Sequence, residues 1–180
     1  MRKALFIAIL MIMMVSFAEA DTILLPGSTW EYTFTDPTGA GGWQTGLAPF
    51  GNRIGPYGPD IAGYFSYNTL WEADGNDGDD LWVRRALDLT GYDLSTIAWN
   101  LGVDNGFKLY VNSNLVYGDN AEGYTHRWEY GGSIPQAFLQ PGNNVIAVAL
   151  EDHGGLTAFD MQITGNQSSV PEPSTILLLV

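Results

Sequence analysis

An acidic run between residues 74 and 80 carries the residue types that bind hard cations. It reads Asp-Gly-Asn-Asp-Gly-Asp-Asp, and Ca²⁺ takes its ligands from carboxylate, amide and carbonyl oxygens. The predicted ligands of a structural Ca²⁺ are Asp74, Asn76, Asp77, Asp79 and Asp80. The spacing differs from an EF-hand loop, because Gly78 falls where a ligand belongs and Asp79 where the glycine belongs. A solvated acidic loop without metal is therefore the alternative interpretation.

Aromatic side chains outside the strand patterns suit the binding of a sugar. Pyranose rings present apolar C–H faces that stack on Trp and Tyr, while their hydroxyls need polar partners. The candidate ligand-binding residues are Tyr64, Trp71, Tyr124, Trp128 and Tyr130. Packing within the fold is the alternative role for these rings. The tryptophans inside strand patterns are expected in the core or on a sheet face, and they are Trp30, Trp43, Trp82 and Trp99.

Residues for catalysis are few. His126 and His153 are the only histidines, and neither lies in a Gly-x-Ser-x-Gly or similar setting. Carboxylates are abundant, but nothing in their spacing marks one as a general acid. The sequence therefore predicts a protein that is not an enzyme.

Charge and cysteine content exclude further classes. The chain has 180 residues, with 7 Lys plus Arg against 20 Asp plus Glu, and a formal net charge of −13. A nucleic-acid surface needs clustered cations, so nucleic acid is excluded as a partner. With 0 cysteines, disulfides and thiolate metal sites are excluded too.

Apolar and polar residues alternate over several strand-length segments, and these predicted strands must position the candidate residues. Leu81, Val83, Leu87 and Leu89 share one face of a predicted strand. Arg85 interrupts that apolar face, and we expect it at a rim beside a carboxylate. Ile97, Trp99, Leu101 and Val103 alternate in the same way, and residues 145–150 are apolar on both faces, which is typical of a central strand.

Turn residues connect these strands. Asp104-Asn105-Gly106 lies between two alternating runs, and Asn-Gly in that position predicts a β-hairpin. Asn112-Ser113-Asn114 predicts a second tight turn. The 22 glycines and 9 prolines fit many short strands, and no stretch keeps a helical period, so the fold class is all-β.

Five segments fall in the order seen in galactose-binding-like β-sandwiches: 27–32, 43–51, 81–85, 104–112 and 139–148. The resemblance implies a jelly-roll β-sandwich forming a single domain over residues 21–165. It also implies carbohydrate binding, and many members of that family hold a structural Ca²⁺. The chain departs from the family at Asn112-Ser113, where Asn-Gly is frequent, and no catalytic domain accompanies the sandwich.

The first 20 residues are typical of a signal peptide. Arg2 and Lys3 precede an apolar run, and Ala18 and Ala20 provide the small residues that a signal peptidase recognises. We expect cleavage after Ala20. A retained membrane anchor is the alternative, but the run from 4 to 17 is shorter than the roughly 20 residues of a spanning helix.

Residues 166–180 resemble a polar linker followed by the start of a PEP-CTERM sorting signal. The motif is Pro171, Glu172 and Pro173, and an apolar run follows at 176–180. The resemblance implies an exosortase as processing partner and transient anchoring in the inner membrane if the full tail exists. That run covers only about 7 Å at the helical rise of about 1.5 Å per residue. We therefore expect a truncated tail, with a decayed signal or a chance Pro-Glu-Pro as alternatives.

Together these features predict an exported, non-catalytic, carbohydrate-binding protein of the cell surface or extracellular matrix. Its partner would be a polysaccharide or other glycan. The alternative is a structural or adhesive biofilm matrix protein that binds no glycan.

Overall fold

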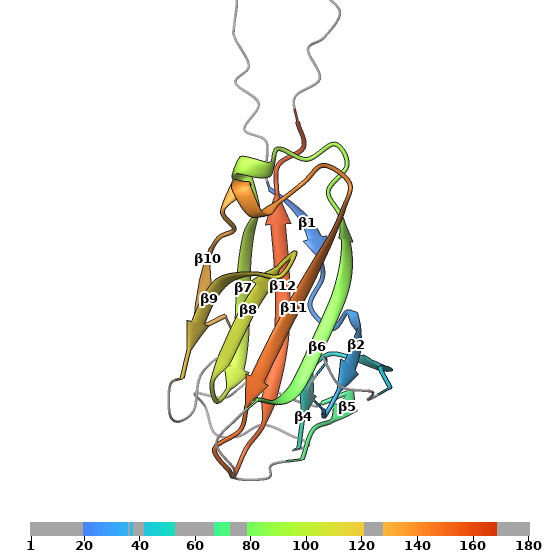
Figure 1. Ribbon diagram of the computed structural model, residues 1–180, viewed down its shortest axis with the longest axis vertical. Coiled ribbons are helices and arrows are strands. Elements are labelled where there is room, and N and C mark those ends of the chain that lie inside the picture. Colours follow the sequence, from blue (N-terminus) through green and yellow to red (C-terminus); the bar gives the residue numbers. More distant parts are fainter. Residues whose placement is uncertain are drawn as a thin grey trace, which may run out of the picture.

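Two β-sheets packed face to face form the structure (Figure 1). The computed structural model describes residues 20–35, 37, 42–52, 67–72, 79–120 and 128–168. The first sheet has the order β10-β7-β12-β4-β5, with β1 pairing β12, and the second has the order β3-β2-β6-β11-β8-β9. The predicted all-β sandwich is confirmed.

The strands are short and mostly antiparallel; β4 and β5 pair in parallel. Their bounds are β1 Asp21–Leu24, β2 Thr29–Thr33, β3 Gln44–Leu47, β4 Phe50–Gly51, β5 Thr69–Leu70, β6 Asp79–Asp88, β7 Ala98–Asp104, β8 Phe107–Val111, β9 Asn114–Asp119, β10 Tyr130–Ser133, β11 Asn143–Glu151 and β12 Ala158–Gly165. Two 3-10 turns lie at Leu94–Thr96 and Gln136–Phe138. Within the described ranges, no helix is long and apolar enough to span a membrane.

The core forms where the inner faces of the two sheets meet. Trp30 of β2 packs edge-on against Phe159 of β12, with ring centroids 5.4 Å apart. The alternating residues of β6 and β7 are buried as predicted. β11 is central in its sheet, between β6 and β8, which confirms the prediction from its two apolar faces. Burial of these apolar side chains provides the main stabilisation of the sandwich.

The connection at Asp104-Asn105-Gly106 is not the predicted hairpin. β7 belongs to the first sheet and β8 to the second, so this turn carries the chain across the sandwich. The peptide bond between Asp104 and Asn105 is cis. Both edges of β7 are occupied, by β10 and β12, and both edges of β8 by β9 and β11. The chain does turn at these residues, as predicted, but β7 and β8 pair with other strands and not with each other.

Two other local predictions have different outcomes. The turn at Asn112 and Ser113 is confirmed, because both residues have positive φ and β8 pairs with β9 across it. Arg85 donates from Nη1 to the backbone carbonyl of Thr29, and its carboxylate partner stays a prediction. The chain alternates between the two sheets along most of its length, as in a jelly roll.

Candidate functional site

The outer face of the second sheet carries a pair of aromatic side chains. Trp82 on β6 and Tyr110 on β8 point away from the core, because their neighbours Leu81, Val83 and Leu109 point into it. The two rings lie 6.0 Å apart between centroids and are within 23° of parallel. Both side chains are half-buried, so they expose ring surface at a sheet face.

Small residues on the intervening strand allow the two rings to meet across it. β11 separates β6 from β8, and Ala149 lies opposite Trp82 while Ala147 lies opposite Tyr110. The result is a hollow of about 560 Å³, a size found for ligand-binding pockets. We call it the aromatic hollow, and its lining residues are Pro37, Trp82, Tyr110, Asn112, Ser113, Val145 and Ala147.

A hydrogen-bonded asparagine pair shapes one rim of the aromatic hollow. Asn112 accepts a hydrogen bond from the Val145 amide at 2.9 Å and donates to Asn144 Oδ1 at 2.8 Å. It also donates to the carbonyl of Phe138 at 2.9 Å. Because these contacts occupy the Asn112 side chain, its role is to hold the turn, and the exposed Ser113 follows it at the rim.

A second hollow lies beside the first on the same sheet face. Its volume is about 390 Å³, and its lining residues are Thr29, Trp30, Glu31, Thr45, Arg84, Arg85 and Ala86. Arg84 Nε donates to Glu31 Oε2 at 2.7 Å, and the guanidinium carbon lies 3.9 Å from the ring centroid of Trp43. We call it the polar hollow, since an ion pair lines it.

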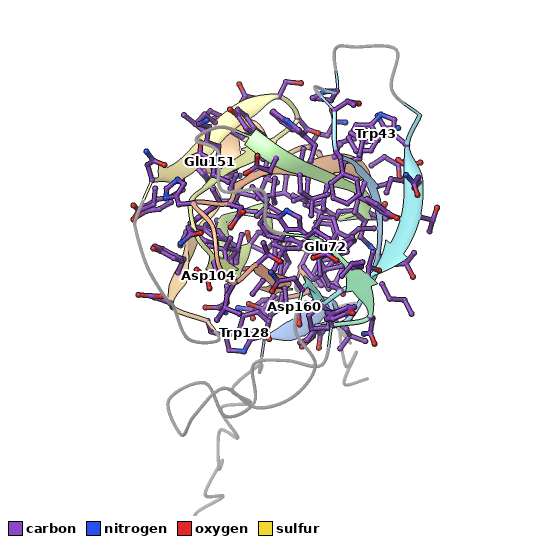
Figure 2. All side chains as sticks on the ribbon, turned by 90° about the horizontal axis from the view of Figure 1, so that it is seen from below. Trp43, Glu72, Asp104, Trp128, Glu151 and Asp160 are labelled. Carbon is purple, nitrogen blue, oxygen red and sulfur yellow. The ribbon has the colours of Figure 1, made fainter. Side chains whose placement is uncertain are left out.

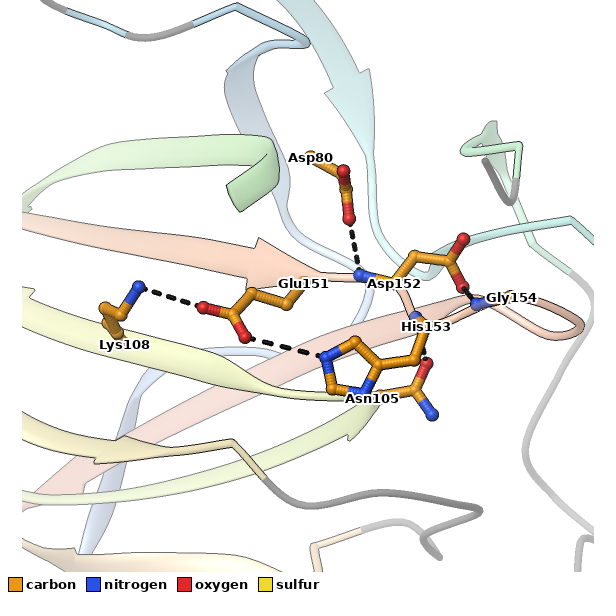
Figure 3. Close-up of polar contacts among 7 residues, drawn as sticks. All are labelled: Asp80, Asn105, Lys108, Glu151, Asp152, His153 and Gly154. Atoms are coloured by element: carbon orange, nitrogen blue, oxygen red, sulfur yellow. Dashed lines mark hydrogen bonds and ion pairs between the residues drawn. The ribbon is translucent and has the colours of Figure 1, made fainter. Parts of the chain in front are cut away.

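One end of the sandwich gathers buried polar groups (Figure 3). Glu151 accepts from Lys108 Nζ at 2.9 Å, and its other oxygen lies 3.7 Å from His153 Nε2. The His153 amide donates to Asn105 Oδ1 at 2.9 Å. Asp80 Oδ2 accepts from the backbone amide of Asp152. These contacts connect the turn after β7 to the segment after β11, so the cluster holds the two sheets together at this end.

Asp104 lies at the same end and is almost fully buried. Burial and, to a smaller extent, the charge of Asp152 raise the pKa of its carboxyl, and His153 lowers it, with a net result of about 7. Loss of hydration disfavours the charged form of a buried carboxylate. Asp104 therefore gains its charge near neutral pH.

Three of the five predicted sugar-binding aromatics, Trp71, Trp128 and Tyr130, lie in the described residues. Trp71 is fully buried, with its backbone amide bound to the Gly51 carbonyl and its carbonyl bound by Thr157. It offers no ring face to a ligand, which corrects its assignment. Tyr64 and Tyr124 lie outside the described residues.

Trp128 and Tyr130 are half-buried at the β10 side of the sandwich. Tyr130 packs edge-on against Phe107 with centroids 4.8 Å apart. Burial raises the pKa of its hydroxyl to about 12, with added repulsion from Asp119, Glu129 and Tyr117. Viewed along the sandwich, Trp128 lies on the side away from Trp43 (Figure 2). Tyr130 thus has a packing role, and its strand β10 belongs to the first sheet, whereas the strands that line the aromatic hollow belong to the second.

The predicted metal ligands are only partly described. Asp74, Asn76 and Asp77 lie outside the described residues, whereas Asp79 and Asp80 begin β6. In the described ranges, no group of three or more His, Asp or Glu side chains is arranged to hold a metal ion. Ala18, Pro171, Glu172, Pro173 and His126 also lie outside these ranges, and Ala20 is exposed just before β1.

The sequence did not single out Trp82 and Tyr110 as ligand-binding residues. Each occupies a solvent-side position of an alternating strand, where a polar residue is usual. An aromatic residue at such a position could have been recognised from the sequence. Their proximity depends on β11 lying between β6 and β8, and no local pattern indicates that pairing.

No protein-family model and no curated protein sequence matches the chain. Among solved structures, it is similar to a PA14 sugar-binding domain from an RTX adhesin, at 17% identity and a TM-score of 0.41, over 78% of this chain and 90% of that one. It is also similar to an FMN-binding β-glucuronidase from F. prausnitzii, at 10% identity and a TM-score of 0.45, over 82% of this chain and 23% of that one. A third similar structure is a GH31 α-xylosidase from Xanthomonas citri, at 12% identity and a TM-score of 0.39. The match covers 83% of this chain and 17% of that one. The chain thus spans less than a quarter of either enzyme.

Proposed function

We propose that this protein is a non-catalytic carbohydrate-binding protein and that the aromatic hollow is its binding site. The observation that carries the proposal is the nearly parallel pair of Trp82 and Tyr110, half-exposed at a hollow of about 560 Å³. The apolar faces of a pyranose ring stack on such rings. Ser113 and the backbone of the adjacent turn offer polar groups for sugar hydroxyls.

This site does not include the aromatic residues that the sequence predicts as ligand-binding. The outward position of Trp82 and Tyr110 adds little to the core, so their rings are available for a ligand without loss of packing. Alanines at 147 and 149 on the intervening strand leave room for both rings on this sheet face. The competing proposal is a structural or adhesive matrix protein without a glycan ligand. In that case Trp82 and Tyr110 bind no sugar.

Replacing Trp82 with Ala is expected to weaken glycan binding about tenfold or more, because loss of ring stacking removes on the order of 1.4 kcal/mol. Affinity electrophoresis of the full chain in gels containing neutral polysaccharides measures this change. Tyr110→Phe should retain binding, since the ring remains, whereas Tyr110→Ala should weaken it.

Tyr117→Ala is the matched control, because Tyr117 is 42% exposed on β9 but lies outside both hollows. Tyr117→Ala should migrate like the wild type in the gels that contain polysaccharide. Equal binding by wild type and Trp82→Ala would exclude the aromatic hollow as the site. Folded wild-type protein that binds no glycan would favour the matrix role.

The sequence supports a proposal of export. A signal peptide ending at Ala20 and an exosortase acting on Pro171, Glu172 and Pro173 would deliver the protein to the cell surface or extracellular matrix. Transient inner-membrane anchoring would accompany a complete tail. Mass spectrometry of the protein from its producing cell should find Asp21 as the first residue, and a retained Met1 would contradict cleavage.

A structural Ca²⁺ on the acidic run remains part of the proposal. A metal that binds only the folded chain would raise its free energy of unfolding by about 2.7 kcal/mol at a free concentration of 100 times Kd. Thermal unfolding with Ca²⁺ and then with a chelator tests this. An unchanged Tm would argue against the metal, and Asp80→Asn should reduce any Ca²⁺-dependent increase.

A further inference from the structure

The aromatic and polar hollows lie side by side on one sheet face. Arg84 in the polar hollow is directly opposite Ala147 in the aromatic hollow, and Ala86 is directly opposite Val145. No strand separates the two, because β6 and β11 are hydrogen-bonded neighbours. The two hollows therefore adjoin along the line between these strands.

We propose that the two hollows form one groove that binds an internal stretch of a neutral, linear polysaccharide, an inference that rests on the proposed carbohydrate binding. The groove crosses the strands from β2 through β6 and β11 to β8. At roughly 4.8 Å between neighbouring strands, that path is about 14 Å long. One pyranose ring on Trp82 and Tyr110 occupies part of the aromatic hollow, and the following sugars extend into the polar hollow.

The ion pair in the polar hollow suits sugar hydroxyls. The side chains of Arg84 and Glu31 are 39% and 53% exposed, so both remain accessible while they bind each other. Only Nε of Arg84 donates within the described part of the chain, which leaves its terminal nitrogens to donate outward. Contact with the Trp43 ring holds the guanidinium in place, so little side-chain freedom is lost on binding.

Charge favours a neutral chain over an acidic one. Glu31, Arg84 and Arg85 together give the polar hollow a net charge of +1, whereas the whole protein carries −13. A polyanion would be repelled at long range by that charge. The position on a sheet face, instead of in an end loop, lets a polymer pass over the site without presenting a chain end.

Isothermal titration of the full chain with cello-, manno- and xylo-oligosaccharides of increasing length tests the groove. For the series that binds, we expect affinity to rise about tenfold between the disaccharide and the hexasaccharide, since only the longer ligand reaches both hollows. Glu31→Gln and Arg84→Met should remove most of that gain and leave disaccharide binding unchanged. Trp82→Ala should weaken both ligands.

Glu129→Gln is the matched control, because Glu129 is exposed and lines neither hollow. Glu129→Gln should keep the full increase of affinity from the disaccharide to the hexasaccharide. Equal affinity for disaccharide and hexasaccharide, or an unchanged gain in Glu31→Gln and Arg84→Met, would overturn the groove while the carbohydrate-binding proposal stands. Absence of binding by every oligosaccharide and by the parent polysaccharides would overturn both.

Discussion

Asn144→Ala is expected to lower the free energy of unfolding by about 3 kcal/mol, because it leaves several polar groups without partners. Asn144 is 1% exposed. Its Oδ1 accepts from the Gln140 amide at 3.0 Å and from Asn112 at 2.8 Å. Its Nδ2 donates to the carbonyls of Gln140 and Gly142, both at 2.8 Å.

Urea unfolding of the two variants Asn144→Ala and Asn143→Ala measures this effect. Asn143 is the adjacent, exposed residue, and its truncation should change stability by no more than about 0.5 kcal/mol. Because Asn144 also holds Asn112 at the rim of the aromatic hollow, its loss should weaken glycan binding as well. Similar stability of the two variants would contradict the buried network.

Asp104→Asn is expected to make the protein more stable than wild type at pH 8, by up to about 4 kcal/mol, with little difference at pH 4. The pKa of Asp104 is raised to about 7 in the folded chain by burial and by Asp152, against roughly 3.9 in the unfolded chain. Between these values the folded state binds more protons than the unfolded state. Wild-type stability therefore falls as pH rises through this window and levels off above it.

The measurement is urea unfolding of wild type and Asp104→Asn at pH 4, 6 and 8, taken as the difference between the two proteins at each pH. Asp93→Asn is the control, because hydrogen bonds from Ser95 lower the pKa of that exposed carboxyl. The control should not gain stability at pH 8. A constant difference between Asp104→Asn and wild type across the range would show that Asp104 does not titrate there.

The burial of the strands could be predicted from local sequence. Ile97, Trp99 and Leu101 alternate with partly exposed residues, and the structure buries all three. Such alternation suffices because side chains of a strand point to opposite faces in turn. The turn at Asn112 and Ser113 was equally local, since it depends on two residues that adopt positive φ.

Features that depend on strand order could not be predicted in this way. Trp71 is buried by contacts with Gly51 and Thr157, which are distant in the sequence. Trp82 and Tyr110 approach each other only because β11, which comes later in the chain, inserts between their strands. The aromatic hollow therefore follows from tertiary pairing and has no continuous sequence signature.

The place of β12 determines when the domain can fold. It is the last strand, yet it lies between β7 and β4 and also pairs with β1, so that Asp21 meets Gly165 (Figure 1). A growing chain that lacks β12 has its first sheet divided into unconnected parts. Contacts between residues so far apart in sequence raise the contact order, which slows folding because a long loop must close before the pairings of β12 with β1 and β4 form. The first sheet can thus become continuous only after the residues of β12 have been synthesised.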